Sequence, residues 1–161
     1  MICMGVNTAL RISDLLELKW GEVYDFNEQC FRKHMVICER KTGKESRIAI
    51  NGSTKKGLLT YMDTLDGVKK GDYIFTGRYA GTHLSRSQAF RIIKHAAYSL
   101  NMERGISCHS MRKTFGYYAW KCGTPPAMLM EIYNHSSYEI TQHYLGIEQD
   151  ERDEIYLKLE L

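Results

Sequence analysis

Two residues in the C-terminal half of the chain combine types that can act on a phosphodiester. His109 and Arg112 stand three positions apart in a predicted helix, so their side chains share one face near its start. Backbone N–H groups at a helix start favour an anion, and a guanidinium can bind two phosphate oxygens at once. An isolated pair of this kind is also typical of a surface arginine beside a core histidine, so the spacing alone leaves both interpretations open.

A histidine and a tyrosine further along extend this pattern. His135 and Tyr144 are nine residues apart, at the start of and within a second predicted helix. The phenol of a tyrosine has an unperturbed pKa of about 10, so it needs cations or a base nearby to become a nucleophile. The alternative is a core tyrosine, and this alternative is strong because the chain contains 11 tyrosines.

The N-terminal part supplies further cations. Arg11 and Asp14 are three residues apart in a predicted leucine-rich helix and therefore share a face. Lys41 lies at the tip of a predicted hairpin, where it can donate a proton or reach the backbone or groove of DNA. An ordinary solvated polar turn explains the same charges. The other basic residues of this hairpin are Arg40, Lys44 and Arg47.

The elements that must position these side chains are mostly helical. Leucine spacing predicts a helix capped by Asn7 or Thr8 and ending before Gly21, and β-rich runs at 34–39 and 46–50 flank a glycine turn. Further helices are predicted at 55–65, at 85–100 with a Ser85–Gln88 capping box, at 107–122 before Gly123, after Pro125-Pro126, after a Ser136–Glu139 capping box, and at 150–159. The fold class is therefore mainly α with a small antiparallel β-sheet (α+β).

The length of 161 residues predicts one domain. The formal net charge is only +3, but residues 148–161 hold six acidic against two basic side chains, which leaves +7 on the rest. Such a distribution suits a polyanionic partner, although ordinary solvated surface accounts for it equally well.

Cysteine and histidine spacing excludes several classes of site. The five scattered cysteines form no C-x-x-C pair, which favours a reducing, intracellular setting over a disulfide framework. No zinc-type histidine spacing and no Gly-rich nucleotide loop occurs, so we expect no metal and no cofactor. No convincing signal peptide and no stretch of transmembrane length is found, which predicts a soluble protein.

Taken in order, these segments resemble the catalytic domain of tyrosine recombinases, the integrases of phages and conjugative elements. The resemblance covers residues 8–147, and its strength lies in five boxes that occur in the right order at compatible spacing. The boxes are Thr8-Ala9-Leu10-Arg11-Ile12-Ser13-Asp14-Leu15, Arg40-Lys41-Thr42-Gly43-Lys44, His109-Ser110-Met111-Arg112, Asn134-His135-Ser136-Ser137 and Tyr144.

The resemblance implies a DNA breaking-rejoining fold and a metal-free transesterification. In this reading Tyr144 attacks a DNA phosphodiester and forms a 3′-phosphotyrosyl link. Arg11 and Arg112 stabilise the charge on the non-bridging oxygens, and His135 donates a further hydrogen bond.

The remaining site residues have supporting roles by the same resemblance. Lys41 protonates the leaving 5′-oxygen, and His109 acts as a general base or positions the tyrosine. Asp14 orients the first arginine box by a hydrogen bond. Choosing Lys41 over Lys44 rests on alignment to the family pattern, and Arg40, Lys44 and Arg47 are expected to contact DNA.

Partners and organisation are implied in the same way. Double-stranded DNA is the expected partner, on which a homotetramer assembles, with possible accessory DNA-bending or directionality factors and no membrane. Residues 1–161 form one catalytic domain with an acidic amphipathic tail at 148–161, which is exchanged between subunits or folds back on its own core. The N-terminal core-binding domain of full-length members is expected to lie outside this chain, and the location is expected to be the cytoplasm (nucleoid) of a bacterium carrying a phage or mobile element.

Two rival functions share the fold. A type IB topoisomerase relaxes supercoils by the same chemistry without exchanging partners, whereas a catalytically inert DNA-binding module keeps only the fold. The short hairpin and paired histidine boxes favour the recombinase over the topoisomerase. The intact set of polar residues argues for an active enzyme.

Overall fold

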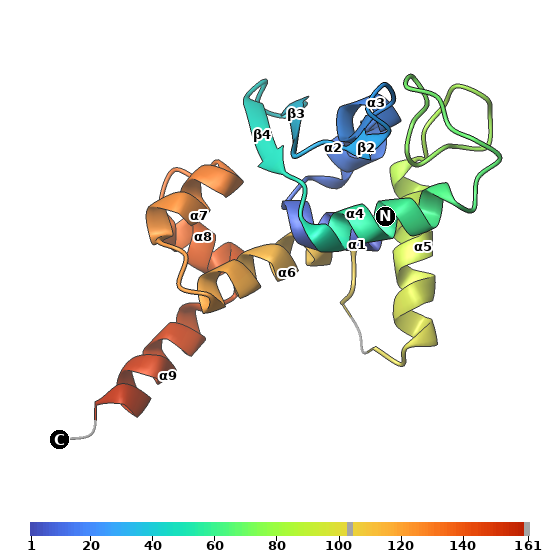
Figure 1. Cartoon of the computed structure of the whole chain (residues 1–161). Helices are drawn as coiled ribbons and strands as arrows, with labels where there is room; N and C mark the ends of the chain where they lie inside the picture. The colour runs from blue at the N-terminus through green and yellow to red at the C-terminus, as the bar shows by residue number, and fades with distance from the viewer. Residues whose placement is uncertain (103–104, 160–161) are drawn as a thin grey trace. The chain divides into compact units, whose positions relative to one another are not determined.

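The computed structural model describes residues 1–102 and 105–159 and divides into two compact units, Met1–Arg112 and Lys113–Leu161 (Figure 1). It is mainly helical, with two small antiparallel sheets of two strands each among the described residues. The predicted fold class is confirmed. The sequence predicted one of the two sheets, and the shorter one was missed.

The first unit begins with short helices rather than the single helix predicted between Thr8 and Gly21. The hydroxyl of Thr8 donates to the carbonyl of Met4 at 2.8 Å, so Thr8 completes the preceding helix instead of capping the next one. Ala9 then takes a left-handed conformation (φ 55°), and Arg11 is extended (φ −66°, ψ 147°) at the N-cap of the following helix. The helices are α1 (Ile2–Thr8), α2 (Ile12–Glu17) and α3 (Trp20–Val23).

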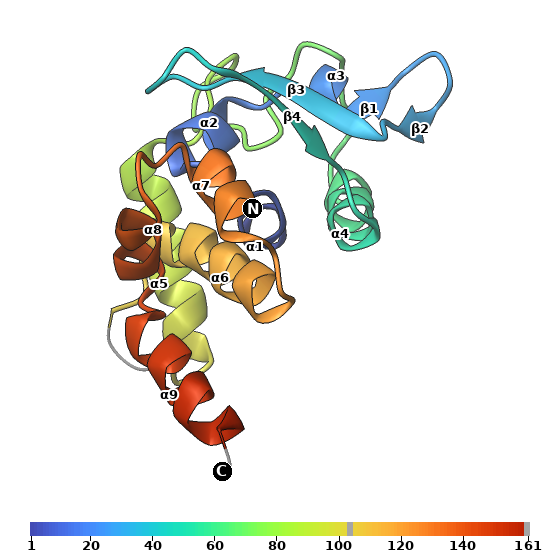
Figure 2. The same cartoon turned by 90° about the vertical axis from the view of Figure 1, so that its left-hand side faces the viewer.

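The two hairpins follow. The short strands β1 (Tyr24–Asp25) and β2 (Cys30–Phe31) pair first, and then β3 (His34–Cys38) pairs with β4 (Glu45–Ala49), which confirms the predicted hairpin (Figure 2). Along β3, Met35 and Ile37 are buried while their neighbours are exposed, the period of two expected of a strand with one covered face. Gly43 closes the turn at φ 67°, a left-handed conformation that glycine adopts without a steric penalty.

Two longer helices complete the core of this unit. Asn51 caps α4 (Gly52–Met62), which therefore starts three residues before the predicted helix at 55–65. The capping box of Ser85 and Gln88 that opens α5 (Arg86–Ser99) is confirmed. Trp20 is almost completely buried and stacks against Tyr61, with ring centroids 6.2 Å apart.

The second unit contains α7 (Pro126–Tyr133), α8 (Tyr138–Leu145) and α9 (Glu148–Lys158), while α6 (Cys108–Lys121) begins in the first unit and continues into the second. The predicted helix stop at Gly123 and helix start at Pro126 are confirmed. The predicted capping box at Ser136 is wrong by one residue, because it is the hydroxyl of Ser137 that accepts from the backbone of Ile140.

A glycine on α6 sets how closely the helices of the second unit pack. A Cβ placed on Gly116 would lie 2.4 Å from the hydroxyl of Tyr133 and 2.5 Å from Leu145. Any larger residue must therefore displace α7 and α8, which carry those two buried side chains.

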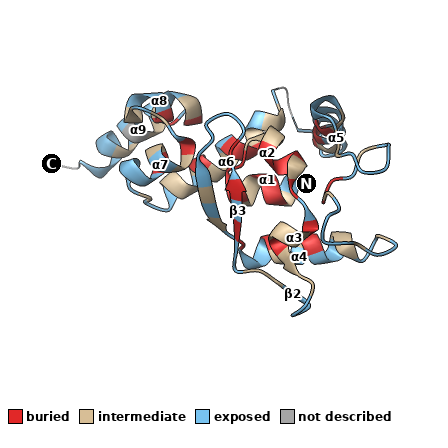
Figure 3. Cartoon of the chain, turned by 90° about the horizontal axis from the view of Figure 1, so that it is seen from above, coloured by how far each residue is buried: buried red, intermediate tan, exposed pale blue. Residues whose placement is uncertain are grey.

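Helix α9 presents apolar side chains to solvent. Ile155, Tyr156 and Leu157 on this helix and Leu159 directly after it are between 59% and 80% exposed. Figure 3 colours much of α9 as exposed. At its start, the hydroxyl of Tyr117 lies 3.0 Å from the carboxylate of Asp150. Residues 160–161 of the predicted tail lie outside the described residues.

Over the described part of the chain, no helix has the length and apolar character that crossing a bilayer requires.

Candidate active site

Arg11 projects from the bend between α1 and α2. Its guanidinium binds the carboxylate of Glu39, the residue that directly follows β3, and its side chain is 20% exposed. Asp14 was expected to orient the arginine box by a hydrogen bond. Its Oδ1 accepts from the hydroxyl of Ser13 within the box at 3.4 Å and from the backbone N–H of Arg40 at 3.2 Å, so Asp14 also links α2 to the hairpin.

Glu39 is a residue of this site that the sequence reasoning missed. It is only 6% exposed, and its carboxylate accepts hydrogen bonds from the hydroxyls of Thr42 and Ser46, both at 3.1 Å, in addition to Arg11. Burial by itself would raise the pKa of Glu39, but the hydrogen bonds from these three donors and the charge of Arg11 hold the pKa below its usual value. Glu39 is therefore a satisfied, buried anion.

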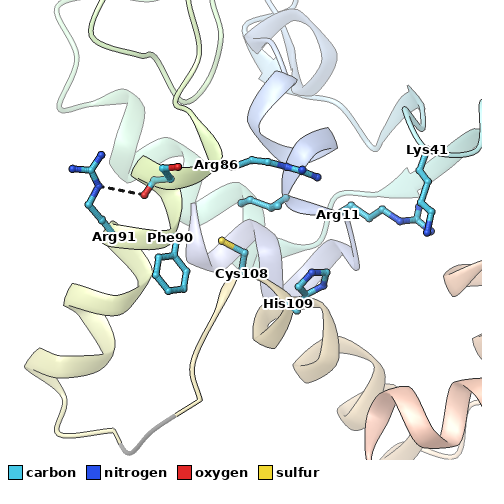
Figure 4. Close-up of a pocket in the computed structure, with 9 residues that line it drawn as sticks. Arg11, Lys41, Arg86, Phe90, Arg91, Cys108 and His109 are labelled. Atoms are coloured by element: carbon cyan, nitrogen blue, oxygen red, sulfur yellow. Dashed lines mark hydrogen bonds between the residues drawn. The ribbon is translucent and has the colours of Figure 1, made fainter.

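The turn after Glu39 carries the predicted general acid. Lys41 is exposed and lines a cleft of about 750 Å³ together with Arg11 and His109 (Figure 4). The backbone of Lys44, in contrast, closes the turn by donating to the hydroxyl of Thr42 at 3.2 Å. Of the two candidate lysines, Lys41 is the one that lies beside the other predicted catalytic residues of the first unit.

The H-x-x-R pair divides between an exposed and a buried position. His109 is exposed and faces the cleft, whereas Arg112 is only 6% exposed. The guanidinium of Arg112 donates to the carbonyl of Ala9, the left-handed residue two positions before Arg11. Arg112 thus holds the bend from which the other predicted catalytic arginine projects.

The opposite side of the cleft comes from α5, which the sequence analysis treated only as a helix. Figure 4 shows Arg86, Phe90 and Arg91 on one side, Lys41 on the other, and Arg11 and His109 between them. The signal that could have identified α5 is an aromatic residue between two arginines near a capped helix start. The full lining consists of Arg11, Ile12, Lys41, Arg86, Ser87, Phe90, Arg91, Cys108 and His109.

The lining of the cleft is cationic. Of the described residues that line it, four carry a permanent positive charge and none carries a carboxylate. Cys108 also lines the cleft, and burial raises the pKa of its thiol above its usual value. A hollow of this charge and size suits an anionic ligand such as a phosphodiester backbone.

The second unit brings His135 and Tyr144 together. Their rings meet edge to face with centroids 5.4 Å apart, and Tyr133 lies 5.3 Å from Tyr144 and 5.5 Å from His135. The ammonium of Lys113 lies 5.7 Å from the centre of the Tyr144 ring, close enough for a cation–π interaction with its face. The Nδ1 of His135 is 3.0 Å from the hydroxyl of Thr141, which fixes the orientation of the imidazole.

The predicted DNA-contact residues of the hairpin have different surroundings. The guanidinium of Arg40 binds the carboxylate of Glu17 on α2. Arg47 is exposed on the outer face of β4, 3.3 Å from the Nδ1 of His34. Arg40 is therefore held against its own unit, whereas Arg47 presents its charge to solvent. Across residues 1–102 and 105–159, no cluster of three or more His, Cys, Asp or Glu side chains forms a candidate metal site.

Known proteins resemble this chain in sequence. The model of the phage integrase family matches residues 1–151. A probable integrase/recombinase YoeC of Bacillus subtilis (strain 168) is 36% identical over 150 residues, which cover 93% of this chain and 77% of that protein. The tyrosine recombinase XerD of Halalkalibacterium halodurans is 23% identical over 92% of this chain, but this match covers only 49% of XerD.

Solved structures share the fold. The XerA recombinase superposes with a TM-score of 0.75 at 20% identity, over 99% of this chain and 56% of that one. A lambda integrase dimer bound to a core site gives a TM-score of 0.67 at 19% identity, over 89% of this chain and 50% of that one. The chain belongs to the phage integrase family, whose sequence and structural relatives here are tyrosine recombinases and integrases. It spans about half the length of most of them.

Proposed function

We propose that this chain is the catalytic part of an enzyme that cuts and rejoins DNA at specific sites through a covalent tyrosine intermediate. The observation that carries the proposal is the cationic cleft lined by Arg11, Lys41 and His109. Its residue types are those that a metal-free attack on a phosphodiester requires, namely guanidinium for the developing charge and ammonium for the leaving oxygen. Membership of the phage integrase family supports the same activity.

In the proposed cleavage step, the phenolic oxygen of Tyr144 attacks the phosphorus of a DNA phosphodiester. A bond forms between this oxygen and phosphorus, and the bond from phosphorus to the 5′-oxygen breaks. Arg11 and Arg112 bind the non-bridging oxygens, where negative charge increases, and His135 donates a further hydrogen bond to them. The step requires Tyr144 and His135 of the second unit to reach a phosphate bound in the cleft of the first.

Proton transfer accompanies the step. Lys41 gives a proton to the departing 5′-oxygen, and His109 accepts the phenolic proton or positions the tyrosine. The 3′-phosphotyrosyl bond keeps the energy of the original linkage, so a 5′-hydroxyl of another strand can attack it and release Tyr144. No nucleotide cofactor is required for this exchange.

Recognition of DNA extends beyond the reacting phosphate. The guanidinium groups of Arg86 and Arg91 on α5 support backbone or base-edge contacts, and Arg47 supports a further phosphate contact on the hairpin. Because phosphate contacts dominate affinity, a chain that spans half the length of most relatives should bind DNA weakly by itself.

Assembly on DNA is part of the proposal. The exposed Ile155 and Leu157 of α9 and Leu159 directly after it suit a segment that packs against a neighbouring subunit, since exposed apolar side chains of this size gain by burial. A homotetramer on two DNA sites, with accessory factors that bend DNA or set the direction of exchange, follows from the family resemblance. Such a complex would act in the cytoplasm, where the DNA is located.

The test uses a library of nicked DNA duplexes with randomised sequence, incubated with the full chain at low salt. A nick on the 3′ side of the cleavage site lets the short fragment that carries the released 5′-hydroxyl diffuse away, so the covalent protein–DNA adduct accumulates. We expect an adduct that survives denaturation and is absent in Tyr144→Phe. Sequencing the captured DNA gives the preferred site.

Tyr118→Phe is the matched control, because Tyr118 is exposed on α6 of the same unit. It neither lines the cleft nor contacts the rings of Tyr133, His135 and Tyr144 in the described interactions. An adduct of unchanged yield in Tyr144→Phe, or its loss in Tyr118→Phe alone, would contradict the proposed nucleophile. Relaxation of a supercoiled plasmid without recombinant product, on DNA that carries the selected site, would indicate a topoisomerase instead.

A further inference from the structure

Three contacts tie the turn that carries Lys41 to helix α2. The carboxylate of Glu39 binds the guanidinium of Arg11, the backbone N–H of Arg40 donates to Asp14 at 3.2 Å, and the side chain of Arg40 binds Glu17. All three join the same end of the hairpin to the same short helix. The contact made by Glu39 is the one that involves a predicted catalytic side chain directly.

Both oxygens of the Glu39 carboxylate are occupied. Its Oε2 accepts from Arg11 and from the hydroxyl of Thr42, and its Oε1 accepts from the hydroxyl of Ser46. Thr42 directly follows Lys41, and Ser46 lies on the returning strand. One buried carboxylate therefore joins the arginine, the turn and β4.

A buried carboxylate of this kind fixes geometry. Removing one partner of a buried ion pair leaves an uncompensated charge, so the arrangement with Glu39 and Arg11 in contact is strongly preferred. A long arginine side chain would otherwise sample many rotamers, and chemistry on a phosphate is sensitive to displacements of about 1 Å. Glu39 removes this freedom, while the Arg11 side chain stays 20% exposed and lines the cleft.

We propose that Glu39 is a positioning residue for the transesterification, which holds the guanidinium of Arg11 at a fixed place relative to the Lys41 turn. Arg11 must bind a non-bridging oxygen and Lys41 must protonate the 5′-oxygen of the same phosphate. The positions of the two side chains must therefore be fixed relative to each other. Glu39 does not touch DNA in this role and acts through Arg11. The inference rests on the proposed function, because it concerns the same site.

An alternative role for Glu39, competition with DNA for Arg11, predicts an effect of opposite sign on the rate and affinity. If the carboxylate instead competed with the DNA phosphate for Arg11, neutralising Glu39 would free the guanidinium. DNA would then bind more tightly or be cleaved faster. The sign of the effect therefore separates positioning from competition.

The experiment measures single-turnover adduct formation on the selected nicked duplex, together with DNA affinity by fluorescence anisotropy. Glu39→Gln keeps the shape and removes the charge, and we expect the rate at saturating DNA to fall about tenfold with affinity unchanged within about twofold. Glu45→Gln removes the same charge from an exposed position on β4 and should leave both quantities unchanged. Ser46→Ala, which deletes one hydrogen bond to Glu39, should slow the reaction about two- to threefold without removing the ion pair.

A double variant shows whether the effect passes through Arg11. In an Arg11→Lys background, which lacks the planar fork, Glu39→Gln should slow the reaction much less than in the wild type. Equal effects in both backgrounds, a wild-type rate in Glu39→Gln, or a faster rate would each overturn the positioning role. If the wild type itself forms no adduct, the proposed function fails. If it forms one and only these variants disagree, the positioning role alone fails.

Discussion

The cleft of the first unit and the tyrosine cluster of the second unit are built in different ways. At the cleft, Arg11 is held by the carboxylate of Glu39, and below the surface Arg112 of the same unit is held by the carbonyl of Ala9. Around Tyr144, the neighbours are the rings of Tyr133 and His135, with the ammonium of Lys113 over the face of the Tyr144 ring. The first arrangement presents charge in a fixed geometry, whereas the second holds a weakly acidic phenol by close packing.

Because of this difference, we expect substitutions in the two regions to affect different properties of the protein. Residues in the cleft should affect the chemistry more than the fold, because several of them are partly exposed. Residues around the tyrosine should affect the fold of their unit first, because packing density there leaves little space. Substitutions in each region can confirm or reject this division.

The largest effect is expected in the cleft. Arg11→Ala should lower the single-turnover rate of adduct formation by about 10²–10³, the usual loss when one donor to a developing oxyanion is removed. Arg47→Ala, on the exposed face of the same hairpin, should instead weaken DNA binding and reduce its salt dependence while the rate at saturating DNA stays unchanged. A salt titration of affinity alongside the rate distinguishes them. An Arg11→Ala variant that changes affinity alone would show that this residue is a binding group.

The next effect is expected in the second unit. Gly116→Ala places a methyl group 2.4 Å from the hydroxyl of Tyr133, and we expect this unit to lose about 3 kcal/mol of stability. Incorporated 5-fluorotryptophan gives one ¹⁹F signal from Trp20 in the first unit and one from Trp120 in the second. During urea unfolding, the Trp120 signal should shift to lower denaturant and the Trp20 signal should not.

The control for this substitution is Gly52→Ala, since a Cβ at Gly52 meets no described atom within 4 Å. It should leave both ¹⁹F transitions in place. Equal shifts of both signals in Gly116→Ala would show that the two units unfold together. The expectation that packing around the tyrosine stabilises the second unit alone would then be wrong.

A pH dependence is expected from Glu39. Its pKa is lower in the folded chain than its ordinary value of 4.5, because hydrogen bonds from Arg11, Thr42 and Ser46 outweigh the effect of burial. A lowered pKa means that the stabilisation is complete above the ordinary value and is lost as the pH falls through the folded value. Urea unfolding from neutral pH down to about pH 3 should therefore show a loss of stability at the acid end that is smaller in Glu39→Gln. Glu45→Gln should keep the acid slope of the wild type.

Most of the fold follows from local patterns, and the failures occur where tertiary contacts decide. The capping box at Ser85, the stop at Gly123 and the alternation along β3 depend on neighbouring residues, and the sequence contains them. The bend at Ala9 does not follow from its own sequence, because alanine favours a helix and the left-handed conformation is imposed by its surroundings.

The site residues also fall into those that local sequence patterns predict and those that only tertiary contacts reveal. The predicted catalytic residues stand in short boxes that the sequence displays, whereas Glu39 and the arginines of α5 contribute through positions far apart in the chain. A glutamate next to an arginine at the end of a strand is typical of an exposed turn. Its burial depends on how the hairpin meets α2, which no local pattern contains.

The smallest effect concerns the cap of the helix that carries the proposed nucleophile. The sequence places a cap at Ser136, but it is the hydroxyl of Ser137 that accepts from the backbone of Ile140 at 3.3 Å. Ser137→Ala should therefore cost about 1 kcal/mol, measured as a shift of the Trp120 transition in urea. Ser136→Ala, at an exposed position one residue away, should cost close to nothing. If Ser136→Ala cost more than Ser137→Ala, the cap would lie where the sequence predicted it, and α8 would begin one residue earlier.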